Sequence, residues 1–152
     1  MTAARFKRLI NWYPPYMGAG IRVTHVSDDF RRIRVEMRLR WYNRNYVGTH
    51  FGGSLFAMAD PFLMIMTIRN LGRDYVVWDK SATIEFLAPG RGTVSAEFVL
   101  TEDDIATMRE QTATGERYLP RFDVNVTDEG GTVVAHIHKE LHVRRRRSAT
   151  AA

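Results

Sequence analysis

The chain has 152 residues, of which 45% are hydrophobic and 26% charged, with no cysteine and a net charge of +5. This length suits one domain, and the lack of cysteine excludes disulfides, thiol catalysis and cysteine-ligated metal centres. Four of the positive charges form the arginine run 144–147. The rest of the chain is therefore nearly neutral, and we predict no basic face for nucleic acid.

The sequence predicts neither a secretory leader nor a membrane span. Residues 1–13 lack the apolar core of a signal peptide. The most apolar stretch, 52–68, is too short for a spanning helix and is interrupted by Asp60 and Pro61. We therefore expect a cytoplasmic protein with a single domain over residues 1–147 and a disordered tail over 148–152.

The first 41 residues predict one helix and two strands. A helix is expected over 3–12, because its apolar residues share one face, and Pro14 and Pro15 should end it before a glycine turn at 18–20. A short strand follows over 22–27. The clearest strand is 32–41, where apolar residues alternate with charged ones: Ile33, Val35, Met37, Leu39 and Trp41.

A polar loop over 42–53 precedes one long helix over 54–71. Because this segment is apolar almost all round, we expect it to be buried on most sides. Strands then follow over 82–86, 94–101, 121–126 and 133–143.

Local motifs mark two connections in this second half. Thr101 and Asp104 resemble a capping box that opens a short helix over 101–115, and residues 128–131 form a hairpin turn. In the last strand Lys139 interrupts the apolar face and is expected to snorkel towards water. Consecutive strands joined by short turns indicate an antiparallel sheet, so the predicted fold class is α+β, with the sheet curled around the helix.

One segment, Asn45-Tyr-Val-Gly48-Thr49-His50-Phe51-Gly52-Gly53-Ser-Leu-Phe-Ala-Met-Ala-Asp60, resembles the loop and helix start of hotdog-fold thioesterases of the phenylacetate-pathway type. The family's usual histidine directly before the glycine pair is replaced here by Phe51, with His50 one position earlier. Pro61 also follows the acidic residue directly. This variant, together with the helical insert over 101–115, is most similar to a branch of the superfamily described as a domain of unknown function.

The resemblance implies a hotdog fold, in which a curled antiparallel sheet wraps around one long central helix. It also implies a homo-oligomer, either a dimer or a dimer of dimers, that hydrolyses acyl-CoA or another acyl thioester without a metal or other cofactor. The expected catalytic residues are Asp60 as general base or nucleophile, Asn45 as the group that orients the substrate, and Gly53. The expected substrate-binding residues are His50, Phe51, Gly52, Phe56 and Ser81.

Physical chemistry supports two of these roles. Backbone N–H groups at Gly52 and Gly53 are free at a helix start, and without side chains a thioester oxygen can approach them closely. An ionised carboxylate at Asp60, among apolar helix residues, is costly to bury without partners.

Each of these residues also has a structural interpretation. Asp60 followed by Pro61 is the pattern of a helix cap with a first-turn proline, or of a kink in one long helix. The glycine pair can permit close packing, and Asn45 and His50 can hold the loop. Ser81 can belong to a salt-bridged strand start, the interpretation we favour there.

A second cluster lies in the last strand, where His136, His138 and His142 share a face with Glu140. Two histidines at alternate strand positions can bind zinc, but a solvated sheet face explains the pattern equally well, so we predict no metal. The alternative function is a non-catalytic hotdog protein that binds acyl-CoA or fatty-acyl groups. Neither nucleic acid nor a membrane span is expected.

Overall fold

The computed structural model describes residues 1–146, so Arg147 and the predicted tail over 148–152 lie outside the described residues. The helices are α1 (Ala3–Ile10), α2 (Pro14–Ala19), α3 (Gly52–Ala57), α4 (Phe62–Leu71) and α5 (Glu102–Gln111). The strands are β1 (Ile21–Val26), β2 (Arg32–Arg38), β3 (Tyr75–Phe86), β4 (Thr93–Val99), β5 (Arg117–Tyr118), β6 (Arg121–Asp128) and β7 (Val133–Arg145).

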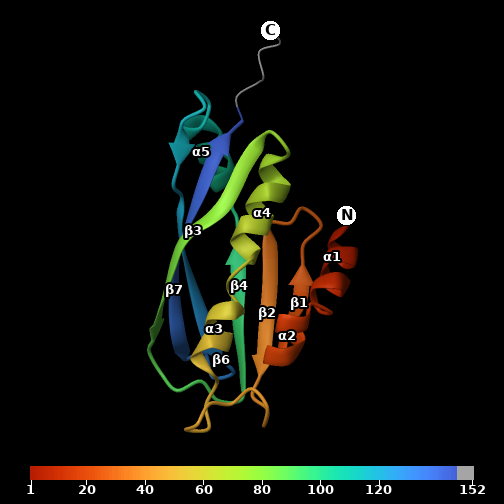
Figure 1. Cartoon of the computed structure of the whole chain (residues 1–152), viewed down its shortest axis with the longest axis vertical. Coiled ribbons are helices and arrows are strands. Elements are labelled where there is room, and N and C mark those ends of the chain that lie inside the picture. Colours follow the sequence, from red (N-terminus) through yellow and green to blue (C-terminus); the bar gives the residue numbers. More distant parts are fainter. Residues whose placement is uncertain (147–152) are drawn as a thin grey trace.

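These strands form one antiparallel sheet in the order β1-β2-β4-β6-β7-β3, with the short β5 paired to β7. The central helical segment, residues 52–71, runs along one face of the sheet, while α1 and α2 flank β1 (Figure 1). The predicted fold class, α+β with a curled antiparallel sheet around a central helix, is confirmed.

Alternation of side chains along the strands separates an inner face, which packs on α3 and α4, from an outer face. In β2 the inward residues Ile33, Val35 and Met37 are fully buried, as predicted. The predicted extension of this strand to residue 41 is wrong, because Trp41 is 82% exposed. The Asn43 side chain bends the chain back by donating to the Arg38 carbonyl at 2.9 Å.

The central helical segment is divided into two helices at residues 58–61. Pro61 has no N–H to continue the helix, and it stands at the N-cap of α4 without a side-chain cap. The break leaves carbonyl groups that need new donors. The Tyr16 hydroxyl donates to the Ala57 carbonyl at 3.3 Å, and the Lys139 ammonium donates to the Asp60 carbonyl. Asp60 therefore sits at a helix break rather than capping α4.

Two elements, α2 and the short strand β5, were not predicted, and β3 begins earlier than expected. Pro14 and Pro15 do not simply end α1: they occupy the first turn of α2, where a missing N–H costs nothing, and Gly20 closes that helix with φ +76°. Strand β3 begins at Tyr75, before the predicted start at residue 82. Its early residues are half-buried and mixed in polarity because β3 is the edge strand, so no alternation marks them.

The predicted local motifs are confirmed. Thr101 and Asp104 form a capping box, each side chain bonding the backbone N–H of the other. In the β6–β7 turn the Asp128 carboxylate accepts from the N–H groups of Gly130 and Thr132 at 2.9 and 2.8 Å. These contacts fix the hairpin that aligns β6 with β7.

Candidate functional site

The centre of the site is Lys139, and the prediction that its ammonium snorkels to water is wrong. Lys139 points to the inner face of β7 and is 2% exposed. Its Nζ atom lies 3.3 Å from Asp60 Oδ1 and 3.2 Å from Asp79 Oδ2, besides donating to the Asp60 carbonyl. We call Lys139, Asp60 and Asp79 the lysine cluster.

A β-bulge in β3 turns Asp79 towards Lys139. Asp79 pairs with Leu141 and Ser81 pairs with Glu140, so Lys80 is an extra residue without a partner in the register. The bulge therefore shifts the alternation of β3 by one position, so that odd-numbered residues face inward before it and even-numbered residues face inward after it. Asp79 points inward with the buried Leu141, whereas Ser81 lies with the outer-face residue Glu140.

The charges of the lysine cluster explain its geometry. A buried ammonium is stable only when paired, and here two carboxylates and a carbonyl surround it. Burial raises the pKa of Asp79, although Lys139 opposes that shift. The Asp60 side chain is 58% exposed, compared with 26% for Asp79. Asp60 therefore presents one carboxylate oxygen to Lys139 and leaves the rest of the group accessible.

Tyr16 closes the other side of the helix break. Its ring is 3% exposed, and burial together with the charge of Asp60 raises the pKa of its hydroxyl. The phenol therefore stays protonated and serves as a hydrogen-bond donor to the Ala57 carbonyl. The backbone around Asp60 is thus held from two sides, by α2 and by β7.

The glycine pair begins α3 and lies directly under two aromatic rings. A Cβ on Gly52 would lie 2.8 Å from Phe86 Cζ, and one on Gly53 would lie 2.5 Å from Phe51 Cε1. A Cβ at either position would displace one of these exposed phenylalanine rings, so the rings pack directly on the glycine backbone. Phe51 stands at the N-cap without a side-chain hydrogen bond to the helix, so the first N–H groups of α3 have no side-chain cap.

Asn45 and His50 serve the loop before α3. The Asn45 amide donates to Thr49 Oγ1 at 2.9 Å, and its oxygen accepts from the N–H groups of Val47 and Thr49 at 3.1 and 3.0 Å. His50 is 3% exposed and its Nε2 lies 3.0 Å from the Gly92 carbonyl oxygen. The loop-holding interpretation accounts for these contacts, and within residues 1–146 no hydrogen bond joins either side chain to Asp60.

The remaining predicted residues lie apart from one another. Phe51 is 56% exposed, Phe56 is half-buried on α3, and Ser81 is on the outer face. Sequence reasoning missed Lys139 and Asp79. For Lys139 the available signal was a lysine at an inward position of an apolar strand face. Asp79 belongs to the strand start for which we favoured a salt-bridged interpretation, but its pairing with Lys139 could not be predicted, because the bulge that turns it inward leaves no mark in the sequence pattern.

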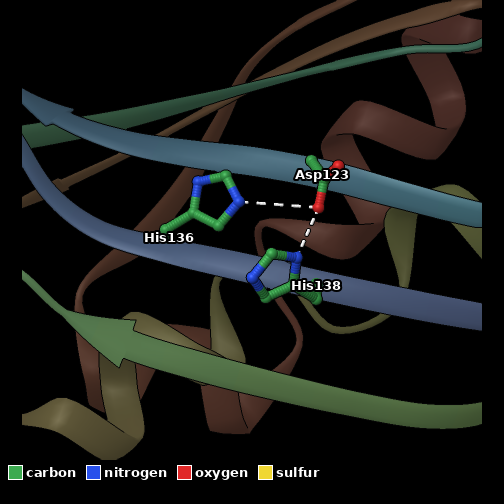
Figure 2. Close-up of side chains that lie close together, drawn as sticks. All are labelled: Asp123, His136 and His138. Atoms are coloured by element: carbon green, nitrogen blue, oxygen red, sulfur yellow. Dashed lines mark hydrogen bonds and ion pairs between the residues drawn. The ribbon is translucent and has the colours of Figure 1, made fainter.

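The predicted histidine group of β7 separates into different environments. His142 stacks on Trp78 with ring centres 3.7 Å apart, and Glu140 pairs with Lys80 and Arg121. His136 and His138 instead converge on Asp123 of β6 (Figure 2). Of the residues described, these three form the one group of histidine and acidic side chains whose donor atoms lie close enough for a shared metal ion.

Solved structures match this fold along nearly its whole length. A Pseudomonas aeruginosa protein of unknown function, described as "Probable Thioesterase", gives a TM-score of 0.85 at 19% identity, covering 96% of this chain and 97% of that one. A thioesterase from Haemophilus influenzae gives 0.69 at 14% identity, covering 99% and 96%. A mutant form of the phenylacetic acid degradation protein PaaI from Thermus thermophilus gives 0.59 at 21% identity, covering 85% and 97%.

At these identities the likeness shows the fold alone, and that fold is the hotdog fold of thioesterase-like proteins. Within this class the chain belongs to the family described as "Domain of unknown function (DUF4442)", which matches residues 2–143. No curated protein matches the sequence. Among residues 1–146, no helix is long and apolar enough to cross a membrane.

Proposed function

We propose that this protein hydrolyses an acyl thioester, of which acyl-CoA is the expected form, with Asp60 as general base. The observation that carries the proposal is the position of the Asp60 carboxylate. It lies at the break in the central helical segment of a thioesterase-like fold, 58% exposed, with one oxygen 3.3 Å from a buried ammonium. A carboxylate held by one oxygen and open at the other is suited to accept a proton from water.

The proposed reaction needs only this chain, water and the thioester. The Asp60 carboxylate accepts a proton from water as the water oxygen attacks the thioester carbonyl carbon. Negative charge then develops on the carbonyl oxygen, where the N–H groups of Gly52 and Gly53 can stabilise it. When the carbon–sulfur bond breaks, the departing thiolate takes the proton from Asp60, which leaves a carboxylic acid and a thiol.

Lys139 and Asp79 are positioning residues in this scheme. By bonding both the carbonyl and the carboxylate of Asp60, Lys139 fixes the backbone and the side chain of the base together. Asp79 is a second carboxylate beside the Lys139 ammonium. The positive charge of Lys139 is therefore balanced by two carboxylates, Asp60 and Asp79. Further contacts to substrate are proposed for Phe51 and Phe56, which are exposed and half-buried, respectively, beside the glycine pair. Asn45 and His50 hold the preceding loop, and Ser81 lies on the outer face, away from Asp60.

The substrate site is proposed to be completed by a second copy of the chain in a cytoplasmic dimer. Strand β3 is the edge of the sheet, and its outer ladder is unpaired among the described residues. Trp78 and Phe86 on this strand are 45% and 58% exposed. A long edge strand with exposed aromatic side chains is a surface that pairs with another strand.

The experiment is a kinetic panel of acyl-CoA substrates of increasing chain length with the wild type and Asp60→Asn. Asparagine keeps the shape of the side chain but cannot take up the proton, so kcat should fall by about 100-fold or more. Asp103→Asn, at an exposed position of α5, is the matched control and should retain wild-type turnover.

Two results would contradict the proposal. Turnover that is unchanged in Asp60→Asn would remove Asp60 from the mechanism. Tight acyl-CoA binding by the wild type without any turnover would replace the hydrolase with the alternative function, a non-catalytic acyl-binding protein.

A further inference from the structure

We propose that Asp123, His136 and His138 on the outer face of β6 and β7 bind a divalent first-row transition metal of the zinc type. We call these three residues the outer-face triad. They lie on the side of the sheet opposite the lysine cluster, because His138 and Lys139 are consecutive residues of one strand and alternate in direction. The inference is independent of the proposed hydrolase.

Strand pairing brings the triad together. His136 and His138 are two positions apart on β7, so their side chains emerge on the same face. Asp123 of β6 pairs directly with His138, and Asn125 pairs with His136. Three side chains with metal-binding atoms therefore start from adjacent points of a rigid hydrogen-bonded ladder rather than from mobile loops.

The distances are close to those that a metal ion requires. Both imidazoles face the same carboxylate oxygen, Asp123 Oδ1, with His138 Nδ1 at 2.5 Å and His136 Nε2 at 3.5 Å (Figure 2). All three donor atoms lie within 4.8 Å of one another. Ligands bound tetrahedrally at about 2.0–2.1 Å are about 3.4 Å apart. A small opening of the His138–Asp123 contact is enough to admit the ion.

Asn125 fixes the orientation of His136 in the manner typical of metal-binding histidines. The Asn125 amide oxygen lies 2.5 Å from His136 Nδ1, and since an amide oxygen only accepts hydrogen bonds, Nδ1 carries the hydrogen. In the neutral ring Nε2 then directs its lone pair towards the Asp123 carboxylate. Two electron-rich atoms that face each other in this way are stabilised by a cation between them.

The arginine and lysine side chains near the triad contact other carboxylates. Lys80 and Arg121 bind Glu140 at 2.9 and 2.8 Å, and on β2 Arg32 binds Glu97 at 2.8 Å and Arg34 lies 3.3 Å from Glu36. Among the described residues, no lysine or arginine forms an ion pair with Asp123. Glu85 of β3 pairs with His136 across the other edge of β7 and adds a further carboxylate on this face. The site is accessible, since the side chains of His136, His138 and Asp123 are 25%, 50% and 67% exposed.

The donor set selects the class of metal. Two imidazole nitrogens and one carboxylate oxygen suit zinc and its neighbours in the first transition row, whereas calcium and magnesium prefer oxygen ligands throughout. The remaining coordination positions would be taken by water. Bound in this way, the ion would cross-link β6 to β7.

The test uses the untagged full-length chain, stripped with a chelator and titrated with Zn²⁺ by calorimetry and by competition with a chromophoric chelator. We expect one Zn²⁺ per chain and no competition from Mg²⁺. His138→Gln and Asp123→Asn should each abolish this binding, and Asn125→Ala should weaken it by about 10-fold because His136 loses its orienting partner. His142→Gln, on the same strand but outside the triad, is the control and should bind as the wild type does.

The unfolding midpoint of each metal-free variant is measured beside that of the metal-free wild type, so that a loss of Zn²⁺ binding is distinguished from a loss of the fold. The proposal is overturned if the wild type binds no Zn²⁺, if His138→Gln and Asp123→Asn bind it as the wild type does, or if His142→Gln loses it equally. As a second readout, Co²⁺ should give visible absorption bands with the wild type that are absent with His138→Gln. Wild-type spectra identical to free Co²⁺ would also overturn it.

Discussion

His138 and Lys139 are neighbours in β7, yet they face opposite sides of the sheet. His138 belongs to a solvent-exposed polar cluster, and Lys139 belongs to a buried one. Lys139 is 2% exposed, and its ammonium contacts the carboxylates of Asp60 and Asp79 and the Asp60 carbonyl. The His138 side chain is 50% exposed and shares a carboxylate oxygen with His136. The Lys139 ammonium is therefore enclosed by the folded chain, whereas water and ions can still reach the His138 imidazole.

This difference decides what each cluster can do. A buried ion pair has lost its hydration, so its partners are fixed and the removal of one of them leaves an uncompensated charge. An exposed group can exchange a protein partner for water or an ion at little cost. The inner cluster is therefore suited to hold a base in place, whereas the outer one is suited to bind something from solution.

The largest expected effect is that of Lys139→Met. Methionine fills similar space but leaves Asp79 and the Asp60 carbonyl without their donor, so the free energy of unfolding should fall by about 3 kcal/mol. Denaturation by urea measures this loss. Lys80→Met, which removes an exposed lysine with a single carboxylate partner, is the matched control. Equal losses in the two variants would mean that burial does not distinguish the two lysines.

A smaller effect, with opposite signs on the two faces, is expected for the pH dependence of stability. Burial raises the pKa of Asp79, so in the wild type its ionisation costs stability as pH rises from its ordinary value of 3.8 through the raised value. The hydrogen bond from His138 lowers the pKa of Asp123. Its ionised form therefore adds stability above pH 3.8, and this is lost as pH falls through the lowered value.

Unfolding free energies of the wild type, Asp79→Asn and Asp123→Asn, compared between about pH 2 and pH 6, measure both slopes. As pH rises, the wild type should lose stability relative to Asp79→Asn and gain stability relative to Asp123→Asn. If both differences change in the same direction, the two faces do not differ in the way proposed.

The smallest effect is expected for Arg121→Ala on the outer face. The Arg121 side chain is 84% exposed, and Glu140 keeps Lys80 as a second partner at 2.9 Å. Exposed ion pairs contribute little, so the thermal midpoint should move by less than about 2 °C, and by less still in high salt. A shift comparable with that of Lys139→Met would show that this surface pair is far stronger than its exposure implies.

Much of the fold could be predicted from the sequence because most of its strands have one solvent-exposed face and one buried face. Alternation located β2, β4, β6 and most of β7, and the capping residues located α5. The same reasoning failed where no such contrast exists. The first half of the edge strand β3 was missed, and so was α2, whose prolines are tolerated only because they occupy its first turn.

The candidate site was less predictable because its contacts depend on strand pairing. Asp60 was identified from the family resemblance and from its cost among apolar residues, but its partner Lys139 is 79 positions away, and Asp79, which shares that lysine, is 19 positions away. The pairing of Asp123 with His138 likewise depends on the register of β6 against β7. Local patterns assign a residue to a face, but they do not determine which residue of another strand it meets there.

The break in the central helical segment also has a consequence for how the chain reaches its final form. Its two donors lie far along the sequence, with Tyr16 41 positions from Ala57 and Lys139 79 positions from Asp60. Contacts of such separation are slow to form, because a long loop must close first. During synthesis, the surroundings of Asp60 stay incomplete until nearly the whole chain has left the ribosome. A nascent or partly folded copy therefore carries the proposed base without the contacts that hold it in the folded chain.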